Sequence, residues 1–199
     1  MPLWKWYNAQ EVKPYLLVNA SLYEGSRPIG TIIEGGQMVQ NAGNGFGFGI
    51  MPDGTAAFGD PWRGWRDYIT GYYGIVQNGK AVPQPDYDPD VFNTTRPRIA
   101  IGQTADGICI ATHGGAKIRD FAAHCVDEGL ISCANLDGGG SRFLIIDRVL
   151  YHDSARTPYN AIAEYLDKIR EEEETVRGVE TKKQPTPISE SELDNELIK

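Results

Sequence analysis

Turn signals recur every few residues along this 199-residue chain, between apolar segments of strand length. Pro52-Asp53-Gly54 and Gln77-Asn78-Gly79 are two examples, and Asp-Gly or Asn-Gly in such a place is typical of a β-hairpin. Many of the 23 glycines lie in the same region, as frequent tight turns require. The pattern predicts a β-rich domain of short antiparallel hairpins. The expected strands are 15–18, 29–33, 37–40, 46–51, 55–58, 72–76, 80–82, 99–102, 107–112, 131–136, 143–146 and 149–151, with a last one beginning near 161.

One segment has a different period. Between 118 and 130 the apolar residues recur at intervals of three and four, which predicts a helix leading into the strand at 131–136. Between 83 and 97 proline, aspartate and asparagine dominate, and this composition indicates a surface loop. We therefore expect an α+β fold that is β-rich, with one main helix packed on the sheet.

Composition divides the chain into three parts. Residues 1–14 are expected to be an N-terminal extension, and 15–167 a single domain. Four consecutive glutamates at 171–174 open a segment rich in charged and polar residues. Residues 168–199 are therefore expected to form an acidic tail, largely disordered or helical.

Charge and cysteine usage exclude several classes of function. The formal net charge is −8, which opposes binding to a nucleic acid polymer because such binding needs a basic face. The three cysteines (Cys109, Cys125 and Cys133) lie in apolar segments without metal-site spacing, so we expect reduced, buried thiols. The sequence shows neither a signal peptide nor a stretch long and apolar enough to span a membrane. We expect a cytoplasmic protein without a membrane partner, cofactor or metal, whose oligomeric state stays open.

The run Asp137-Gly138-Gly139-Gly140-Ser141 places a carboxylate, three glycines and a hydroxyl directly after a predicted buried strand. Three consecutive glycines are expensive to order, so they indicate a sharp turn whose backbone approaches another group closely. Arrays of backbone N–H groups bind anions such as phosphate. The aspartate adds acid/base capacity or an acceptor for a sugar hydroxyl. A tight glycine turn without a binding role is the alternative.

Further clusters of polar residues border the predicted strands. Arg27 precedes Pro28 just before a strand, and Arg98 enters an apolar strand. Arginine binds phosphate through two parallel hydrogen bonds, although a solvated turn arginine would satisfy the same local pattern at Arg27. His113 precedes two glycines at the start of the predicted helix. The pattern is consistent with an anion site at the helix start and equally with a histidine that has only a structural role.

Taken in order, these motifs resemble those of the phosphodiester glycosidase family, over roughly residues 16 to 166. The resemblance implies cleavage at the anomeric carbon of a sugar, with a phosphomonoester as leaving group. The segment 135–141 is the most specific of the motifs when it follows a helix and an Arg-x-Ala-x-Gly strand. The motifs that carry the resemblance are Asn19, 27–30, 98–102, 106–107, 135–141, Arg156 and 160–161.

The resemblance also implies roles for individual residues. Arginines and the amides of the glycine turn would hold the phosphate, and asparagines would orient sugar hydroxyls or the phosphate. Asp137 is the first candidate for general acid/base or nucleophile, and Glu34 is the second carboxylate that glycoside hydrolysis commonly uses. The candidate catalytic residues are Asp137, Glu34 and His113. The candidate substrate-binding and phosphate-binding residues are Asn19, Arg27, Thr31, Arg98, Gly138, Gly139, Gly140, Ser141, Arg142 and Asn160.

Three departures from the family pattern bear on the substrate. Ala20-Ser21 follows Asn19, His113-Gly114-Gly115 stands where the family commonly has Asp-Gly-Arg, and Arg142 follows Ser141. We expect a hydrolase that cleaves an N-acetylglucosamine-1-phosphodiester-like bond in a small or glycan substrate, in a bacterial or phage-encoded version. An alternative is a catalytically altered module that sequesters a phosphodiester sugar or nucleotide. A structural protein that grips a surface glycan is a third hypothesis.

Overall fold

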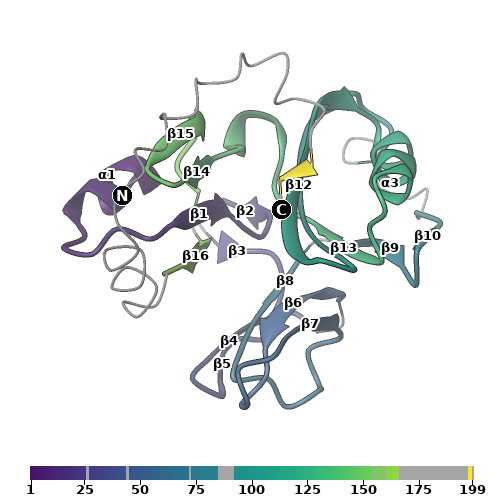
Figure 1. The fold of residues 1–199 in the computed structure, drawn as a ribbon. Helices are drawn as coiled ribbons and strands as arrows, with labels where there is room; N and C mark the ends of the chain where they lie inside the picture. The colour runs from purple at the N-terminus through teal and green to yellow at the C-terminus, as the bar shows by residue number, and fades with distance from the viewer. Residues whose placement is uncertain are drawn as a thin grey trace, which may run out of the picture.

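The computed structural model describes residues 1–25, 27–43, 45–71, 73–84, 92–154, 156–158, 160–165 and 197–198. Its strand pairs are antiparallel and form sheets of six, five, four and two strands. Figure 1 shows the four-stranded sheet on one side, the six-stranded sheet on the other, and the five-stranded sheet projecting below both. The β-rich α+β fold predicted from the hairpin signals is therefore observed.

The six-stranded sheet carries helix α3 (Ile118–Asp127) on one face. Apolar residues of the helix and of the sheet form one core cluster, in which Phe121 and Cys125 are fully buried. The strand order is β10 (Lys80–Ala81), β9 (Gly74–Gln77), β13 (Ser132–Asn135), β11 (Arg96–Thr104), β12 (Gly107–Ala116) and β17 (Leu197–Ile198).

The four-stranded sheet packs against the N-terminal helix α1 (Leu3–Ala9). Leu3 and Tyr7 of the helix are buried with Leu17 and Phe143 of the neighbouring sheet region. The segment predicted as an N-terminal extension thus contributes to a hydrophobic cluster. The strand order is β15 (Val149–His152), β14 (Leu144–Ile146), β1 (Leu16–Asn19) and β16 (Ala161–Glu164).

The five-stranded sheet is built from two predicted hairpins joined by β8 (Asp67–Thr70), a strand that the sequence pattern did not predict. β8 pairs with β4 on one side and β6 on the other. The strand order is β5 (Gln37–Gln40), β4 (Ile32–Glu34), β8, β6 (Gly47–Ile50) and β7 (Ala56–Gly59). A separate two-stranded hairpin pairs β2 (Tyr23–Glu24) with β3 (Arg27–Pro28).

Several expectations need correction or lie outside the described residues. The described part contains two α-helices, α1 and α3, and the 3-10 turn η1 (Gly139–Ser141). The expected surface loop ends earlier than 97, because β11 already begins at Arg96. Residues 85–91 lie outside the described part, as does the predicted tail apart from 197–198.

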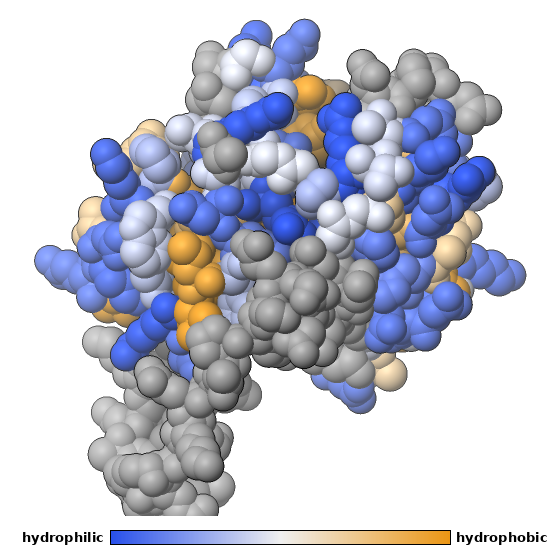
Figure 2. Space-filling view, turned by 90° about the horizontal axis from the view of Figure 1, so that it is seen from above, coloured by the Kyte–Doolittle hydropathy of each residue, from blue (hydrophilic) through white to orange (hydrophobic). Residues whose placement is uncertain are grey.

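The face shown in Figure 2 and the state of the cysteines are those expected from the amino-acid composition. Figure 2 shows a face that is mostly hydrophilic, with apolar residues confined to narrow strips. The three cysteines are free and buried, as their apolar surroundings predicted. Within the described residues, no helix has the length and hydrophobicity needed to cross a membrane.

Candidate functional site

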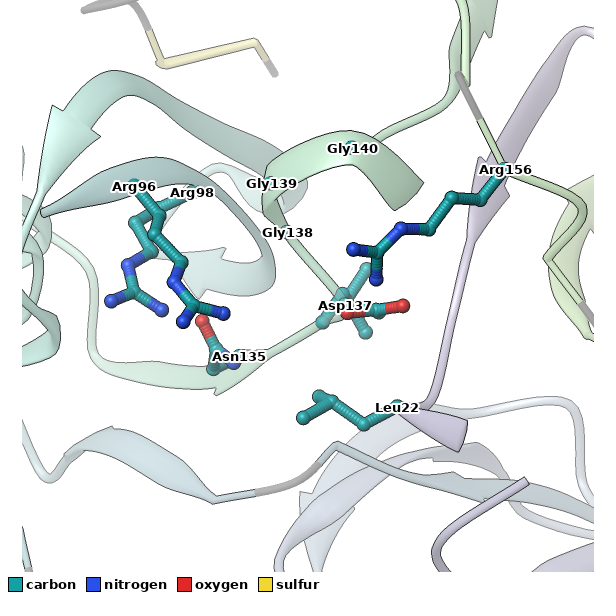
Figure 3. Close-up of a pocket in the computed structure, with 10 residues that line it drawn as sticks. Leu22, Arg96, Arg98, Asn135, Asp137, Gly138, Gly139, Gly140 and Arg156 are labelled. Carbon is teal, nitrogen blue, oxygen red and sulfur yellow. The ribbon is translucent and has the colours of Figure 1, made fainter. Parts of the chain in front are cut away.

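A cavity of about 280 Å³ lies where β13 leaves the six-stranded sheet and passes the start of β11. Figure 3 shows Arg96 and Arg98 on one side of it with Asn135 directly below their guanidinium groups, and Asp137 and Arg156 on the other side. The glycine turn borders the same cavity. The lining residues are Leu22, Arg96, Arg98, Asn135, Leu136, Asp137, Gly138, Gly139, Gly140 and Arg156.

The alternation of an extended chain places Asn135 and Asp137 in this cavity. Leu136, between them, is 1% exposed and belongs to the hydrophobic core shared by the four- and six-stranded sheets. Because successive side chains of an extended segment point to opposite sides, burying Leu136 turns both of its neighbours toward the cavity.

Hydrogen bonds from the end of β1 fix the backbone of Asp137. The N–H of Asp137 donates to the carbonyl oxygen of Ala20 at 2.8 Å. The side-chain Nδ2 of Asn19 donates to the carbonyl oxygen of Asp137 at 2.6 Å, and its Oδ1 accepts from the N–H of Phe143 at 2.7 Å. Asn19 therefore holds the two ends of the glycine turn together from beneath.

Gly138 and Gly139 of the turn are glycines for different structural reasons. A Cβ added at Gly138 would overlap the carbonyl oxygen of Pro97, so the turn can lie against β11 only with glycine there. Gly139 has a φ of +59°, in the left-handed region, and has open space around its missing Cβ. Ser141 closes the turn, donating its N–H to the carbonyl oxygen of Gly138 at 3.2 Å.

Arg98 lies at the floor of the cavity with 4% of its surface exposed. Its Nε donates to the carbonyl oxygen of Ala116 at 2.9 Å, and its Nη2 donates to that of Thr94 at 2.8 Å. Burial, together with the nearby charge of Arg96, lowers the pKa of Arg98 to about 10. The guanidinium therefore remains protonated at neutral pH.

Arg96 and Arg156 are exposed and border the cavity from two different segments. The pairing of β11 with β12 contains a register shift: Arg98 lies opposite His113, whereas Arg96 lies opposite Ala116. The extra residue lies on β12, and Arg96 and Arg98, two positions apart on β11, both border the cavity. Together the three arginines provide three positive charges around one carboxylate.

Burial raises the pKa of Asp137 above its ordinary value. A hydrogen bond from the Ser141 side chain and the charges of Arg156 and Arg96 act in the opposite direction. Ser141 is itself fully buried and lies 3.3 Å from the hydroxyl of Tyr23. A carboxylate held in this way suits proton transfer or nucleophilic attack better than a fully solvated one.

Comparison with known proteins assigns the chain to a family. A sequence model of the phosphodiester glycosidases matches residues 13–167. The chain belongs to the phosphodiester glycosidase family. A search of curated protein sequences gave no significant match.

Solved structures share the fold. The zebrafish N-acetylglucosamine-1-phosphodiester α-N-acetylglucosaminidase catalytic domain, auto-inhibited by pro-peptide, is similar with a TM-score of 0.64 and 20% identity, over 77% of this chain and 64% of that one. A hypothetical protein from Synechocystis has a TM-score of 0.52 and 14% identity, over 76% of this chain and 50% of that one. This chain thus aligns with less than two thirds of each of these structures.

In this family member the cavity brings together part of the candidate set. Asp137, Arg98 and the three glycines line it, and the buried Ser141 contacts Asp137 from behind. Arg142 follows the turn, where its N–H is 3.4 Å from the carbonyl oxygen of Gly139, and its side chain is not among the lining groups.

The other candidates near β1 to β4 lie elsewhere. Asn19 acts on the backbone beneath the turn, as described above. Arg27 is exposed on the β2–β3 hairpin, opposite Glu24. Thr31 is buried, and its Oγ1 donates to the carbonyl oxygen of Gly43 at 3.0 Å. These contacts place Arg27 and Thr31 outside the cavity lining.

Glu34, His113 and Asn160 are also outside the lining. Glu34 is exposed at the end of β4 and borders a different cavity, beside the five-stranded sheet. The Nδ1 of His113 accepts from the N–H of Gly115 at 3.1 Å, and its ring lies 5.5 Å from that of His124. Asn160 borders a cavity beside α1, and its carbonyl oxygen accepts from the N–H of Ala20.

Sequence reasoning assigned no role to three polar groups of the cavity, Arg96, Arg156 and Asn135. Arg96 carried a signal, since it stands two residues before Arg98 in an extended segment. Arg156 and Asn135 both stood in family motifs without an assigned role, and the alternation around Leu136 shows that Asn135 faces the cavity. Within the described residues, no group of three His, Cys, Asp or Glu side chains is arranged to hold a metal ion.

Proposed function

We propose that this chain hydrolyses the glycosidic bond of a sugar-1-phosphodiester, releasing the sugar and a phosphomonoester. The observation that carries the proposal is the cavity in which three arginines face one half-buried carboxylate, in a member of the phosphodiester glycosidase family. The zebrafish protein with a similar fold is an N-acetylglucosamine-1-phosphodiester α-N-acetylglucosaminidase, so an N-acetylglucosamine diester is the first substrate to test.

The arginines hold the phosphate in this proposal. Arg98 provides a fixed charge at the floor, and Arg96 and Arg156 close over the phosphate from the rim. Charge-assisted hydrogen bonds from guanidinium groups to phosphate oxygens are short and directional. As the bond from the anomeric carbon breaks, its electron pair passes to the phosphate oxygen, and the arginines stabilise the added negative charge.

Asp137 faces the anomeric carbon. It either takes the proton of the attacking water or attacks the carbon itself to form a glycosyl ester that water then hydrolyses. In both cases the carboxylate must be ionised at the start. The phosphate leaves without a proton donor, because the neighbouring guanidinium groups offset its charge.

Hydrolysis in ¹⁸O-labelled water tests the proposal. Cleavage between the anomeric carbon and oxygen places ¹⁸O in the released sugar, whereas cleavage between phosphorus and oxygen places it in the phosphate. Mass spectrometry of both products from an N-acetylglucosamine-1-phosphodiester is expected to find the label in the sugar. Label in the phosphate would identify a phosphodiesterase and refute glycosidic cleavage.

One observation favours the alternative, a module that sequesters its ligand intact. Glycosidases commonly use two carboxylates across the scissile bond. Among the described residues that line the cavity, Asp137 is the acidic one, and Glu34 borders another cavity. The same experiment separates the two functions, since a sequestering module returns the bound diester unlabelled and uncleaved.

The pH dependence of kcat/KM provides a prediction about Asp137. Because burial raises the pKa of Asp137 and the ionised form is needed, activity should fall with decreasing pH at a value above the ordinary aspartate pKa of about 3.9. Arg156→Gln removes a charge that lowers this pKa, so the acidic limb should move to higher pH. The measurement is kcat/KM as a function of pH for both proteins.

Arg119→Gln is the matched control for this charge change, because Arg119 is exposed on α3 and paired with Asp120. Its acidic limb should coincide with that of the wild-type protein. An acidic limb that stays in place in Arg156→Gln, or moves to lower pH, would contradict the role given to Asp137.

A further inference from the structure

Asn135 carries an unsatisfied acceptor inside the cavity. The residue is 3% exposed, and within the described part of the chain its buried Oδ1 has no hydrogen-bond partner. Its backbone is fixed, because the N–H donates to the carbonyl oxygen of Tyr73 at 3.0 Å and β13 pairs with β11 at Ala100. A buried acceptor without a partner is costly, so its retention in a cavity indicates that a ligand satisfies it.

The missing partner must be a hydrogen-bond donor. An amide oxygen only accepts, and the oxygens of an ionised phosphodiester also only accept. The phosphate that the arginines would bind therefore leaves Oδ1 unsatisfied. The O–H and N–H groups of a sugar are donors that can reach the same cavity.

The position of Asn135 indicates which part of the sugar it contacts. Figure 3 shows its side chain directly below the guanidinium groups of Arg96 and Arg98, with the carboxylate of Asp137 to one side. Residues two apart on an extended segment are separated by about 6.6 Å, a distance comparable with one sugar ring. With phosphate at the arginines and the anomeric carbon at Asp137, the substituent next to the anomeric carbon lies closest to Asn135.

We infer that Asn135 determines specificity by accepting a hydrogen bond from the O–H or N–H group at position 2 of the sugar. The inference rests on the proposed function for the placement of the sugar. It is nevertheless a statement about binding, which can be measured whether or not the bond is cleaved. Asn135 would then select sugars with a hydroxyl or acylamino group at this position against sugars without one.

Equilibrium binding of sugar 1-phosphates tests the inference by calorimetry. The ligands are glucose 1-phosphate, N-acetylglucosamine 1-phosphate and 2-deoxyglucose 1-phosphate. Wild-type protein should bind the better of the first two about tenfold or more tightly than the 2-deoxy compound. Asn135→Ala should bind that same ligand and the 2-deoxy compound with affinities within about twofold of each other, because the variant lacks the amide oxygen that accepts the hydrogen bond from position 2. The better ligand identifies the donor as a hydroxyl or an amide.

Two further measurements separate this role from a structural one. Inorganic phosphate should bind Asn135→Ala as it binds the wild-type protein, which shows an intact arginine site. Asn135→Asp keeps acceptor oxygens, so it should keep the preference over the 2-deoxy compound even though its added charge weakens all three affinities. Equal preference in wild type and Asn135→Ala, or no preference in wild type, would overturn the inference. If wild-type protein showed this preference in binding but did not hydrolyse a sugar-1-phosphodiester, the proposed function would be refuted and the inference about Asn135 would stand.

Discussion

Asp137→Asn is expected to lower kcat for a sugar-1-phosphodiester by roughly 10³- to 10⁴-fold, the range of general acid/base or nucleophilic groups. Asparagine keeps the size of the side chain and can still receive the hydrogen bond from Ser141, but it can neither accept a proton nor form a glycosyl ester. The backbone of residue 137 should stay in place, because its carbonyl oxygen accepts from the Asn19 side chain and its N–H donates to the carbonyl oxygen of Ala20. Steady-state kinetics with the diester substrate measure the loss.

Binding of inorganic phosphate distinguishes lost chemistry from a lost site. Removing the carboxylate leaves three arginines without an opposing charge, so phosphate should bind Asp137→Asn at least as tightly as wild type. Asp120→Asn on α3 is the control, since it removes an exposed carboxylate paired with Arg119, outside the cavity. A kcat within about tenfold of wild type would show that Asp137 is not the reacting group.

The glycine turn and Asp137 could be predicted from sequence because their signal is local. A carboxylate followed by three glycines after an apolar strand has few structural solutions, and the turn does border the cavity. Arg98 was predictable for a related reason. A charged residue inside an apolar strand needs polar partners, and it finds them in the carbonyl groups of Ala116 and Thr94.

Residues on hairpins could not be placed in the same way, because a hairpin signal does not say which sheet the hairpin joins. Glu34 and Thr31 belong to the five-stranded sheet or its approach, and that sheet is completed by β8. β8 contains three residue types that favour strands, Tyr68, Ile69 and Thr70, but it is only four residues long and forms no hairpin with a neighbouring segment, since its partners β4 and β6 are distant in sequence. Because β8 was not predicted, the sequence could not show that Glu34 belongs to the five-stranded sheet and lies away from the glycine turn.

Gly138→Ala is expected to be more damaging than a methyl group added at Gly139. Its Cβ would overlap the carbonyl oxygen of Pro97, a backbone atom that cannot rotate away. The turn and the start of β11 must separate, at a cost of about 3 kcal/mol, comparable with other overpacked sites. For a domain of this size the loss corresponds to a fall in Tm of roughly 6–12 °C. Thermal unfolding followed by circular dichroism measures it.

Activity should fall more than stability suggests, because the same movement shifts Asp137 relative to the arginines. A displacement of about 1 Å at a reacting group can reduce the rate roughly 100-fold. We therefore expect kcat/KM of Gly138→Ala to fall by about that factor at a temperature where the protein remains folded.

Gly139→Ala and Gly35→Ala separate this overlap from backbone strain. Both glycines have left-handed φ values, +59° and +56°, and both have open space where a Cβ would stand. Each variant should lose about 1–2 kcal/mol from strain alone. Gly35 lies in the β4–β5 turn, so its variant should keep full activity. If Gly138→Ala lost no more stability than Gly35→Ala and kept full activity, the prediction would be contradicted. Contact between the turn and β11 would then not be what positions Asp137 relative to the arginines.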